Sequence, residues 1–261
     1  MKNPIGIFDS GIGGLSIWKE INTLMPCEST IYFADAKNAP YGEKSKHEII
    51  AYCHSITNFL LDKNVKIIVV ACNTATTNVI SSLRKNFSVP FIGIEPATKP
   101  AAINTKTGKI GILATKGTLQ SELFYTTSNN YRGKVEIIET IGSDLVRLIE
   151  LGKTEDTKPL LIKYLSPMIE RGVDNIVLGC THYPFLIPII KTLIPDSINI
   201  IDTGAAVALQ TKYILKENGL LTNVANLGNH TFYTNGETEI LRAFIGKVTD
   251  KSDQISLTKI D

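Results

Sequence analysis

Two apolar segments that each end in a cysteine constrain the fold of this chain more than any other feature. The first runs from Val65 to Cys72 and the second from Asp174 to Cys180. Neither segment alternates polar and apolar residues, which is typical of a strand buried on both faces of a parallel sheet. Each cysteine is therefore predicted at the carboxyl end of a strand, where α/β proteins bind their ligands.

Further matching segments recur at a nearly constant spacing, which indicates an internal repeat. Corresponding residues lie 104 to 108 positions apart, and the pairs are Ile5 and Ile110, Ile31 and Val135, Cys72 and Cys180, and Glu95 and Asp202. We therefore expect two related halves, and if they face each other their cysteines meet across the cleft from opposite sides.

Strand-like segments alternate with helical patterns along both halves, and this order favours βαβ units and parallel sheets. The predicted fold class is α/β, with two pseudo-symmetric domains that each contain a central, largely parallel sheet. We predict a first domain at residues 1–97, a second at residues 98–207, and an active site in the cleft between them.

The C-terminal part adds a predicted helix at Ala205–Lys216, a short strand at Thr231–Tyr233 and a last helix from about Glu237. A helix, a strand and a helix have too little surface to bury a core of their own. We therefore expect residues 208–261 to complete the first domain.

Composition excludes several classes of protein. The chain has 261 residues and a net charge of +2 that is spread along it, so binding to nucleic acid or to an anionic membrane is not indicated. No apolar run approaches the roughly 18 residues that a transmembrane helix needs, and nothing resembles a signal peptide. Four cysteines without secretory features are typical of reduced thiols. We expect a soluble cytoplasmic protein.

A pair of facing thiols suits one class of reaction. Inverting a carbon that carries an acidic hydrogen requires a base on one face and an acid on the other. An ordinary thiol pKa of about 8.5 makes both forms accessible, and the helix after each strand favours the thiolate. Asn73, Thr74 and Thr181 can bind carboxylates and a developing enediolate. The pattern is compatible with racemisation of an amino acid without an organic cofactor.

Four motifs together resemble the cofactor-independent aspartate/glutamate racemase family. They occur in the family's order over most of the chain, at Asp9–Gly14, Pro40–Gly42, Cys72–Thr76 and Gly179–Pro184. The resemblance implies interconversion of L- and D-glutamate, which would supply D-glutamate for peptidoglycan in a bacterium. It also implies that the reaction needs no cofactor and no metal.

The resemblance further implies roles for individual residues. Cys72 would be the acid/base for the D enantiomer and Cys180 for the L enantiomer, with Asp9 and His182 assisting the two thiols. Asp9 and His182 would also contact the substrate, together with Ser10, Tyr41, Gly42, Asn73, Thr74, Thr118 and Thr181. Glu150 matches a further family position with weaker local identity, because Ser143 and Asp144 replace a Cys-Pro pair that many members carry.

Other interpretations of these residues fit the sequence less well. A lone cysteine at a strand end is more often structural, but the repeated context favours catalysis. Zinc bound by Cys72, Cys180, His182 and Asp9 would match no usual ligand spacing. The glycine-rich turn after Asp9 lacks the third glycine of a dinucleotide fingerprint. Glu95 and Asp202 are expected to shape the cleft rather than to catalyse.

Other functions remain open at this point. A cofactor-free decarboxylase on the same scaffold needs a thiol on only one face, so the cysteine pair argues against it. A non-catalytic binding protein for small acids would need neither thiol. Aspartate is the alternative substrate within the family. The sequence carries no signal about allosteric activation or oligomeric state, and a homodimer is left open.

Overall fold

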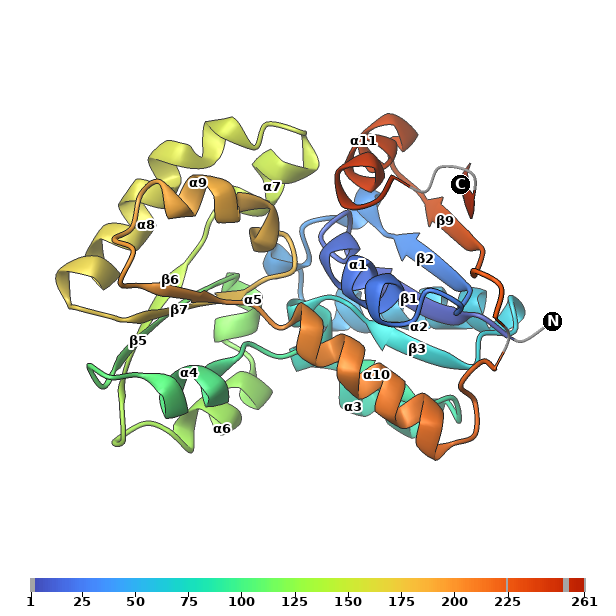
Figure 1. The fold of residues 1–261 in the computed structure, drawn as a ribbon, viewed down its shortest axis with the longest axis horizontal. Helices are drawn as coiled ribbons and strands as arrows, with labels where there is room; N and C mark the ends of the chain where they lie inside the picture. Colours follow the sequence, from blue (N-terminus) through green and yellow to red (C-terminus); the bar gives the residue numbers. More distant parts are fainter. Residues whose placement is uncertain (1–2, 224, 251–253, 261) are drawn as a thin grey trace.

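The computed structural model describes residues 3–223, 225–250 and 254–260, and in it the chain forms two separate parallel sheets (Figure 1). The first sheet has the order β10 (Ile255–Lys259), β9 (His230–Thr234), β2 (Thr30–Ala34), β1 (Ile5–Asp9), β3 (Ile67–Val70) and β4 (Phe91–Gly93). The second has the order β6 (Glu136–Ile141), β5 (Lys109–Ala114), β7 (Asn175–Gly179) and β8 (Asn199–Ile201). The predicted α/β class with parallel sheets is confirmed.

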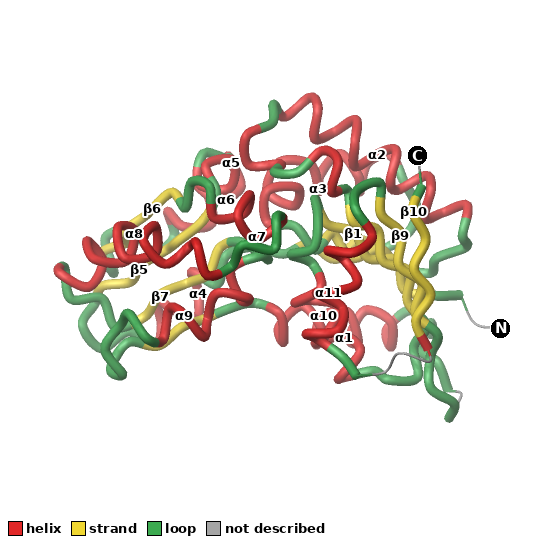
Figure 2. Tube along the Cα trace, turned by 90° about the horizontal axis from the view of Figure 1, so that it is seen from above, coloured by secondary structure: helices red, strands yellow, loops and turns green. Residues whose placement is uncertain are grey.

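Helices cover both faces of the first sheet, which explains its uninterrupted apolar strands. Figure 2 shows α2 and α3 on one side of the strands and α1, α10 and α11 on the other. Alternate strand residues pack into different cores, since Ile7 joins the core that contains Trp18, whereas Phe8 joins the core that contains Ile49. The bounds are α1 (Leu15–Leu24), α2 (Lys46–Asp62), α3 (Asn73–Asn86), α10 (Gly204–Glu217) and α11 (Thr238–Val248).

The second sheet carries helices of 4 to 8 residues, apart from one with 13 residues. They are α4 (Thr98–Asn104), α5 (Lys116–Leu119), α6 (Glu122–Asn129), α7 (Leu145–Glu150), α8 (Lys158–Glu170) and α9 (Ile187–Lys191). Short 3-10 turns complete the chain, at η1 (Ala36–Asn38), η2 (Tyr41–Glu43), η3 (Glu155–Thr157) and η4 (Tyr183–Leu186). In the described ranges, no helix is long and apolar enough to cross a membrane.

The C-terminal part returns to the first sheet. Strand β9 pairs with β2 so that Thr234 lies opposite Ala34, and β10 then pairs with β9. The predicted helix, strand and last helix of this part are confirmed as α10, β9 and α11, whereas β10 was not predicted. The division into domains at 97/98 and 207/208 stays a prediction, and its second boundary would fall within α10.

Candidate active site

The two cysteines close one cavity from opposite halves of the molecule. Cys72 follows β3 directly, Cys180 follows β7, and their side chains are 5% and 6% exposed. Both line one small cavity where the carboxyl edges of the two sheets meet. Its other lining residues are Ser10, Pro40, Tyr41, Gly42, Asn73, Thr74, Thr115, Val146, Thr181 and His182.

Most of the residues named from the sequence therefore lie together. Asp9, Thr118 and Glu150 are not in the cavity wall, but each is hydrogen-bonded to a residue that is. Sequence reasoning missed Thr115 and Val146, which the structure adds to the wall. Thr115 follows β5 immediately, at the same sheet edge as Cys180, and this position was the available signal.

The surroundings of Cys72 favour its neutral thiol over the thiolate. Burial raises the pKa of Cys72, and the charge of Asp9 raises it further, against hydrogen bonds from the Ala75 backbone and Ser10. The thiol lies 3.8 Å from the Ser10 hydroxyl. The expectation that helix α3 would favour a thiolate here is thus outweighed by desolvation, because a buried sulfur loses the hydration that a negative charge requires.

Cys180 has a cationic neighbour instead. Its sulfur lies 3.8 Å from His182 Nδ1, and His182 Nε2 lies 2.5 Å from Glu150 Oε1. Burial lowers the pKa of His182, but the bonds to Cys180 and Glu150 and the nearby carboxylate charges raise it well above its usual value. The imidazolium then donates from both ring nitrogens, one toward the sulfur and one toward Glu150.

Asp9 links the two halves beneath the cavity. Its Oδ1 accepts from the Gly11 N–H at 2.8 Å, and its Oδ2 accepts from the Thr181 hydroxyl at 3.0 Å. Burial raises the pKa of Asp9 to about 6, with Glu150 adding to the rise and His182 opposing it. Asp9 is therefore a carboxylate above that pH, and it places a negative charge near Cys72.

The glycine-rich loop after β1 is explained by close approach of the second half. A Cβ atom on Gly11 would lie 1.9 Å from Glu150 Oε1, and one on Gly13 would lie 2.2 Å from His182 Nδ1. The Ile12 N–H also donates to Glu150 Oε1 at 2.8 Å. These glycines therefore make room for the Glu150–His182 pair rather than for a nucleotide phosphate.

Polar groups line the far wall of the cavity. Thr74 Oγ1 lies 2.8 Å from Thr115 Oγ1, which donates to Thr118 at 3.0 Å. Among the residues that the structure describes, neither polar atom of the buried Asn73 amide has a hydrogen-bond partner. A buried amide left unpaired in a cavity wall is a group that a bound polar ligand would satisfy.

Three further predictions concern groups around the cavity. Within the described ranges, no three His, Cys, Asp or Glu side chains are grouped so that they could hold a metal ion, and the absence of a metal stays a prediction. Burial raises the pKa of Glu95, which lies outside the cysteine cavity. Asp202 lines a small neighbouring cavity with Asn73 and Cys180, so its role in shaping the cleft stays a prediction.

Known proteins match nearly the whole length of this chain. The family described as Asp/Glu/Hydantoin racemase matches residues 13–211. A glutamate racemase of Herpetosiphon aurantiacus is 44% identical over 90% of this chain and 93% of its own length. A glutamate racemase of Pseudomonas putida is 42% identical over 97% of this chain and 96% of its own length.

Solved structures agree with these sequence relatives. Glutamate racemase RacE1 from Bacillus anthracis has a TM-score of 0.88 at 31% identity, covering 99% of this chain and 97% of that one. Escherichia coli glutamate racemase, solved with L-glutamate and the activator UDP-MurNAc-ala, has a TM-score of 0.86 at 30% identity, covering 99% and 98%. An aspartate racemase homologue from Pyrococcus horikoshii, 17% identical with a TM-score of 0.50, shares the fold alone.

Proposed function

The chain belongs to the Asp/Glu/Hydantoin racemase family, and we propose that it is a glutamate racemase that moves protons between two thiols and the substrate α-carbon. The observation that carries the proposal is the pair of buried cysteines, one from each half, in the wall of one cavity. Aspartate is the less supported substrate, because relatives at 42% and 44% identity are named glutamate racemases.

The mechanism starts from different protonation states of the two cysteines. With L-glutamate bound, Cys180 is the thiolate and takes the α-proton, while the His182 imidazolium hydrogen-bonds its sulfur. Cys72, a neutral thiol, then gives its proton to the opposite face of the carbanion and becomes the thiolate. The product is D-glutamate, and the reverse reaction runs through the same two groups with their roles exchanged.

The substrate is held by the polar wall of the cavity. The unpaired Asn73 amide and the Thr74 and Thr115 hydroxyls offer donors for two carboxylates, and Thr118 bonds both threonines from outside the wall. Donors that are fixed in position before the reaction can stabilise the carbanion without reorganising. Ser10, Tyr41, Gly42 and Thr181 complete the wall.

The proposal extends to the cellular role. D-glutamate from this reaction would enter peptidoglycan, and the enzyme would work in the reducing cytoplasm. The four cysteines are free thiols, which supports a reducing compartment, and two of them would lose their function on oxidation.

Circular dichroism of purified protein with L-glutamate and no added cofactor tests the function. We expect the optical signal to decay to zero, before and after dialysis against a chelator. An unchanged signal would contradict racemase activity, and activity that zinc restores after dialysis would contradict the two-thiol mechanism. A visible absorption scan of the active enzyme that showed an internal aldimine band would contradict the absence of pyridoxal phosphate.

A further inference from the structure

The loop after β9 lies beside the loop that carries Tyr41. Asp35 follows β2 and Asn235 follows β9, and these neighbouring strands pair in parallel up to Ala34 and Thr234. Both side chains therefore emerge at the sheet edge that faces the cleft. Asn235 Nδ2 donates to Asp35 Oδ1 at 2.6 Å.

Asp35 connects Asn235 to Tyr41 in the cavity wall. Its other oxygen, Oδ2, accepts from the hydroxyl of Tyr41, and Asn38 donates to Oδ1 at 2.8 Å. The Asp35 and Tyr41 side chains are buried, at 2% and 1% exposure. A buried carboxylate needs such donors, because it has lost its water. Asn235 is thus one of three groups that fix the carboxylate to which Tyr41 is bonded.

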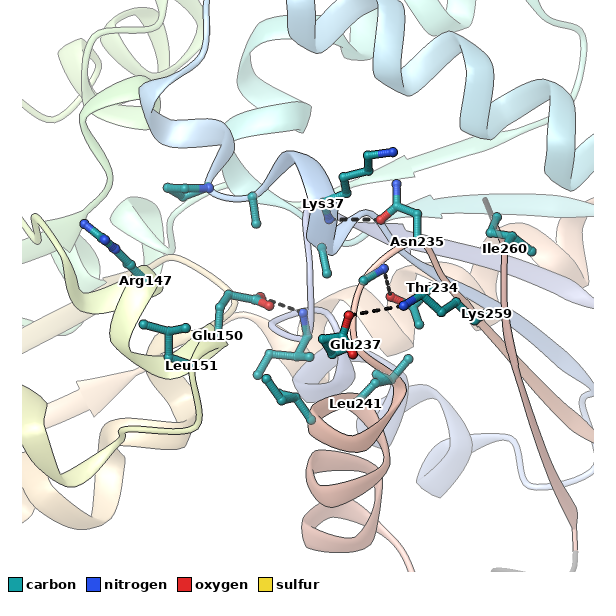
Figure 3. Close-up of a pocket in the computed structure, with 16 residues that line it drawn as sticks. Lys37, Arg147, Glu150, Leu151, Thr234, Asn235, Glu237, Leu241, Lys259 and Ile260 are labelled. Atoms are coloured by element: carbon teal, nitrogen blue, oxygen red, sulfur yellow. Dashed lines mark hydrogen bonds and ion pairs between the residues drawn. The ribbon is translucent and has the colours of Figure 1, made fainter.

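The orientation of Asn235 is itself fixed. Figure 3 shows the Lys37 N–H donating to Asn235 Oδ1, at 3.0 Å. The NH₂ group therefore faces Asp35. The next residue, Gly236, lies so close to Ala36 that a Cβ atom on it would be 2.6 Å from the Ala36 methyl group. The position of this loop against η1 is therefore fixed, and so is the orientation of the Asn235 side-chain amide.

We propose that Asn235 is a positioning residue for the substrate site, which acts through Asp35 on Tyr41 and on the adjacent Gly42. A residue of the C-terminal loop, outside the cysteine cavity, then determines how tightly that cavity binds glutamate. The inference rests on the proposed function, because glutamate is the ligand whose binding is measured.

Three variants separate this role from simple packing. Asn235→Ala removes the donor, and Asn235→Asp keeps the shape but places a second carboxylate against Asp35. Asn229→Asp is the matched control, since it makes the same charge change at the opposite end of β9, where the Asn229 backbone N–H bonds Ser29. If Asn235 only fills space, the isosteric Asp variant is milder than Ala; if it donates to Asp35, the Asp variant is the more severe.

Steady-state kinetics at about pH 8, where carboxylates are ionised, supplies the readout, with thermal unfolding to verify that each variant is folded. We expect Asn235→Ala to raise KM for glutamate roughly tenfold with kcat changed less than about twofold, and Asn235→Asp to raise KM further. Asn229→Asp should match the native enzyme. The inference is wrong if Asn235→Asp has a native KM, or if its effect is smaller than that of Asn235→Ala.

A double-mutant cycle tests the route through Tyr41. Tyr41→Phe removes the hydroxyl that bonds Asp35, so adding Asn235→Ala should raise KM by much less than it does alone. Additive effects would overturn the inference. If the native enzyme racemises glutamate and the Asn235 variants behave like it, this inference alone is wrong. If the native enzyme has no racemase activity, the proposed function is wrong.

Discussion

The two cysteines occupy equivalent places in the two halves and have opposite surroundings. Cys72 lies near the carboxylate of Asp9 and the hydroxyl of Ser10, and its pKa is raised by burial. Cys180 lies beside the His182 ring, whose pKa is raised by the bonds to Cys180 and Glu150 against the effect of burial. The position at the end of a strand therefore brings each sulfur to the substrate, while the neighbouring side chains determine its charge.

The elements that follow the two cysteines also differ. Cys72 caps the 14-residue helix α3, whereas Cys180 is followed by the 3-10 turn η4 of 4 residues. A short 3-10 turn has few aligned peptide dipoles, so it contributes little positive potential at its start. In the second half, a protonated histidine supplies the positive charge that a long helix could have supplied.

Replacing either cysteine by serine should have the largest effect. A serine hydroxyl is far less acidic than a thiol, so Cys72→Ser and Cys180→Ser should each lower racemisation by roughly a thousandfold or more. In deuterated water, Cys72→Ser should slowly label L-glutamate at the α-carbon and form almost no D-glutamate. Cys180→Ser should label D-glutamate only.

Nuclear magnetic resonance of the recovered glutamate enantiomers measures this labelling. Cys53→Ser is the matched control, because Cys53 is a buried thiol on α2 outside the cavity wall. It should racemise at nearly the native rate. Free racemisation by either single variant at the cavity, or labelling of the same enantiomer by both, would contradict opposed thiols.

The second prediction concerns the histidine side of the comparison. His182→Asn should lower kcat about a hundredfold, because Cys180 loses its charged neighbour. Since enantiomers have equal free energies, kcat/KM must fall equally in both directions, so α-deuterated substrates are needed to find the slowed step. The isotope effect should increase for L-glutamate and decrease for D-glutamate.

Two further variants test whether the change in isotope effects is specific to the charged His182–Glu150 pair. Glu150→Gln keeps an oxygen acceptor for His182 but removes the charge, so the same change in isotope effects should be weaker. His54→Asn is the control, because His54 bonds Ser82 at 3.0 Å and lies outside the cavity wall. Equal isotope effects for both enantiomers in His182→Asn would show that His182 does not act through Cys180.

Sequence reasoning predicted the features that depend on local pattern. Apolar runs identified β3 and β7, the internal repeat identified the two facing cysteines, and the α/β class with parallel sheets is confirmed. These succeed because a buried parallel strand has a distinctive composition and its carboxyl end has a fixed place in the sheet.

Features that depend on contacts between distant residues were not predictable. Strand β10 buries only part of Ile255 and Leu257, and it exists because β9 offers an edge to pair with. The bond between His182 and Glu150 joins residues 32 positions apart, and the bond between Asn235 and Asp35 joins residues 200 positions apart. No local pattern encodes either pair: the first joins the end of helix α7 to the turn after β7, and the second joins the residues that follow β2 and β9.

The fall of kcat at acidic pH, which is the acid limb of the pH–rate profile, tests the surroundings of Cys72. Because the pKa of Asp9 is about 6, its carboxylate becomes protonated below that pH, and the charge near Cys72 is lost. We expect kcat of the native enzyme to fall up to tenfold per pH unit below about pH 6. Asp9→Asn should be slower at neutral pH and should lack this limb; an identical limb in the variant would assign it to another group.

The smallest effect is on stability, and it comes from the same carboxyl group. The folded pKa of Asp9, about 6, lies above the ordinary value of 3.8, so folding favours the neutral acid. Its contribution to the free energy of unfolding is therefore complete below about pH 4 and is lost as the pH rises through about 6. A shift of about two units corresponds to about 3 kcal/mol.

Urea unfolding of the native enzyme and of Asp9→Asn at several pH values measures this contribution, because other groups cancel in the difference. The native enzyme should lose about 3 kcal/mol relative to the variant between about pH 4 and 7. Asp174→Asn should change the opposite way: its slight burial is outweighed by hydrogen bonds from Thr105, Lys106 and Thr107, which lower the pKa of Asp174. The native enzyme should therefore gain stability relative to Asp174→Asn as the pH rises to about 4, and it should keep that gain at higher pH. Parallel curves for native and Asp9→Asn would mean that Asp9 is not a buried, desolvated acid, and the contrast between the two thiols would then rest on His182 alone.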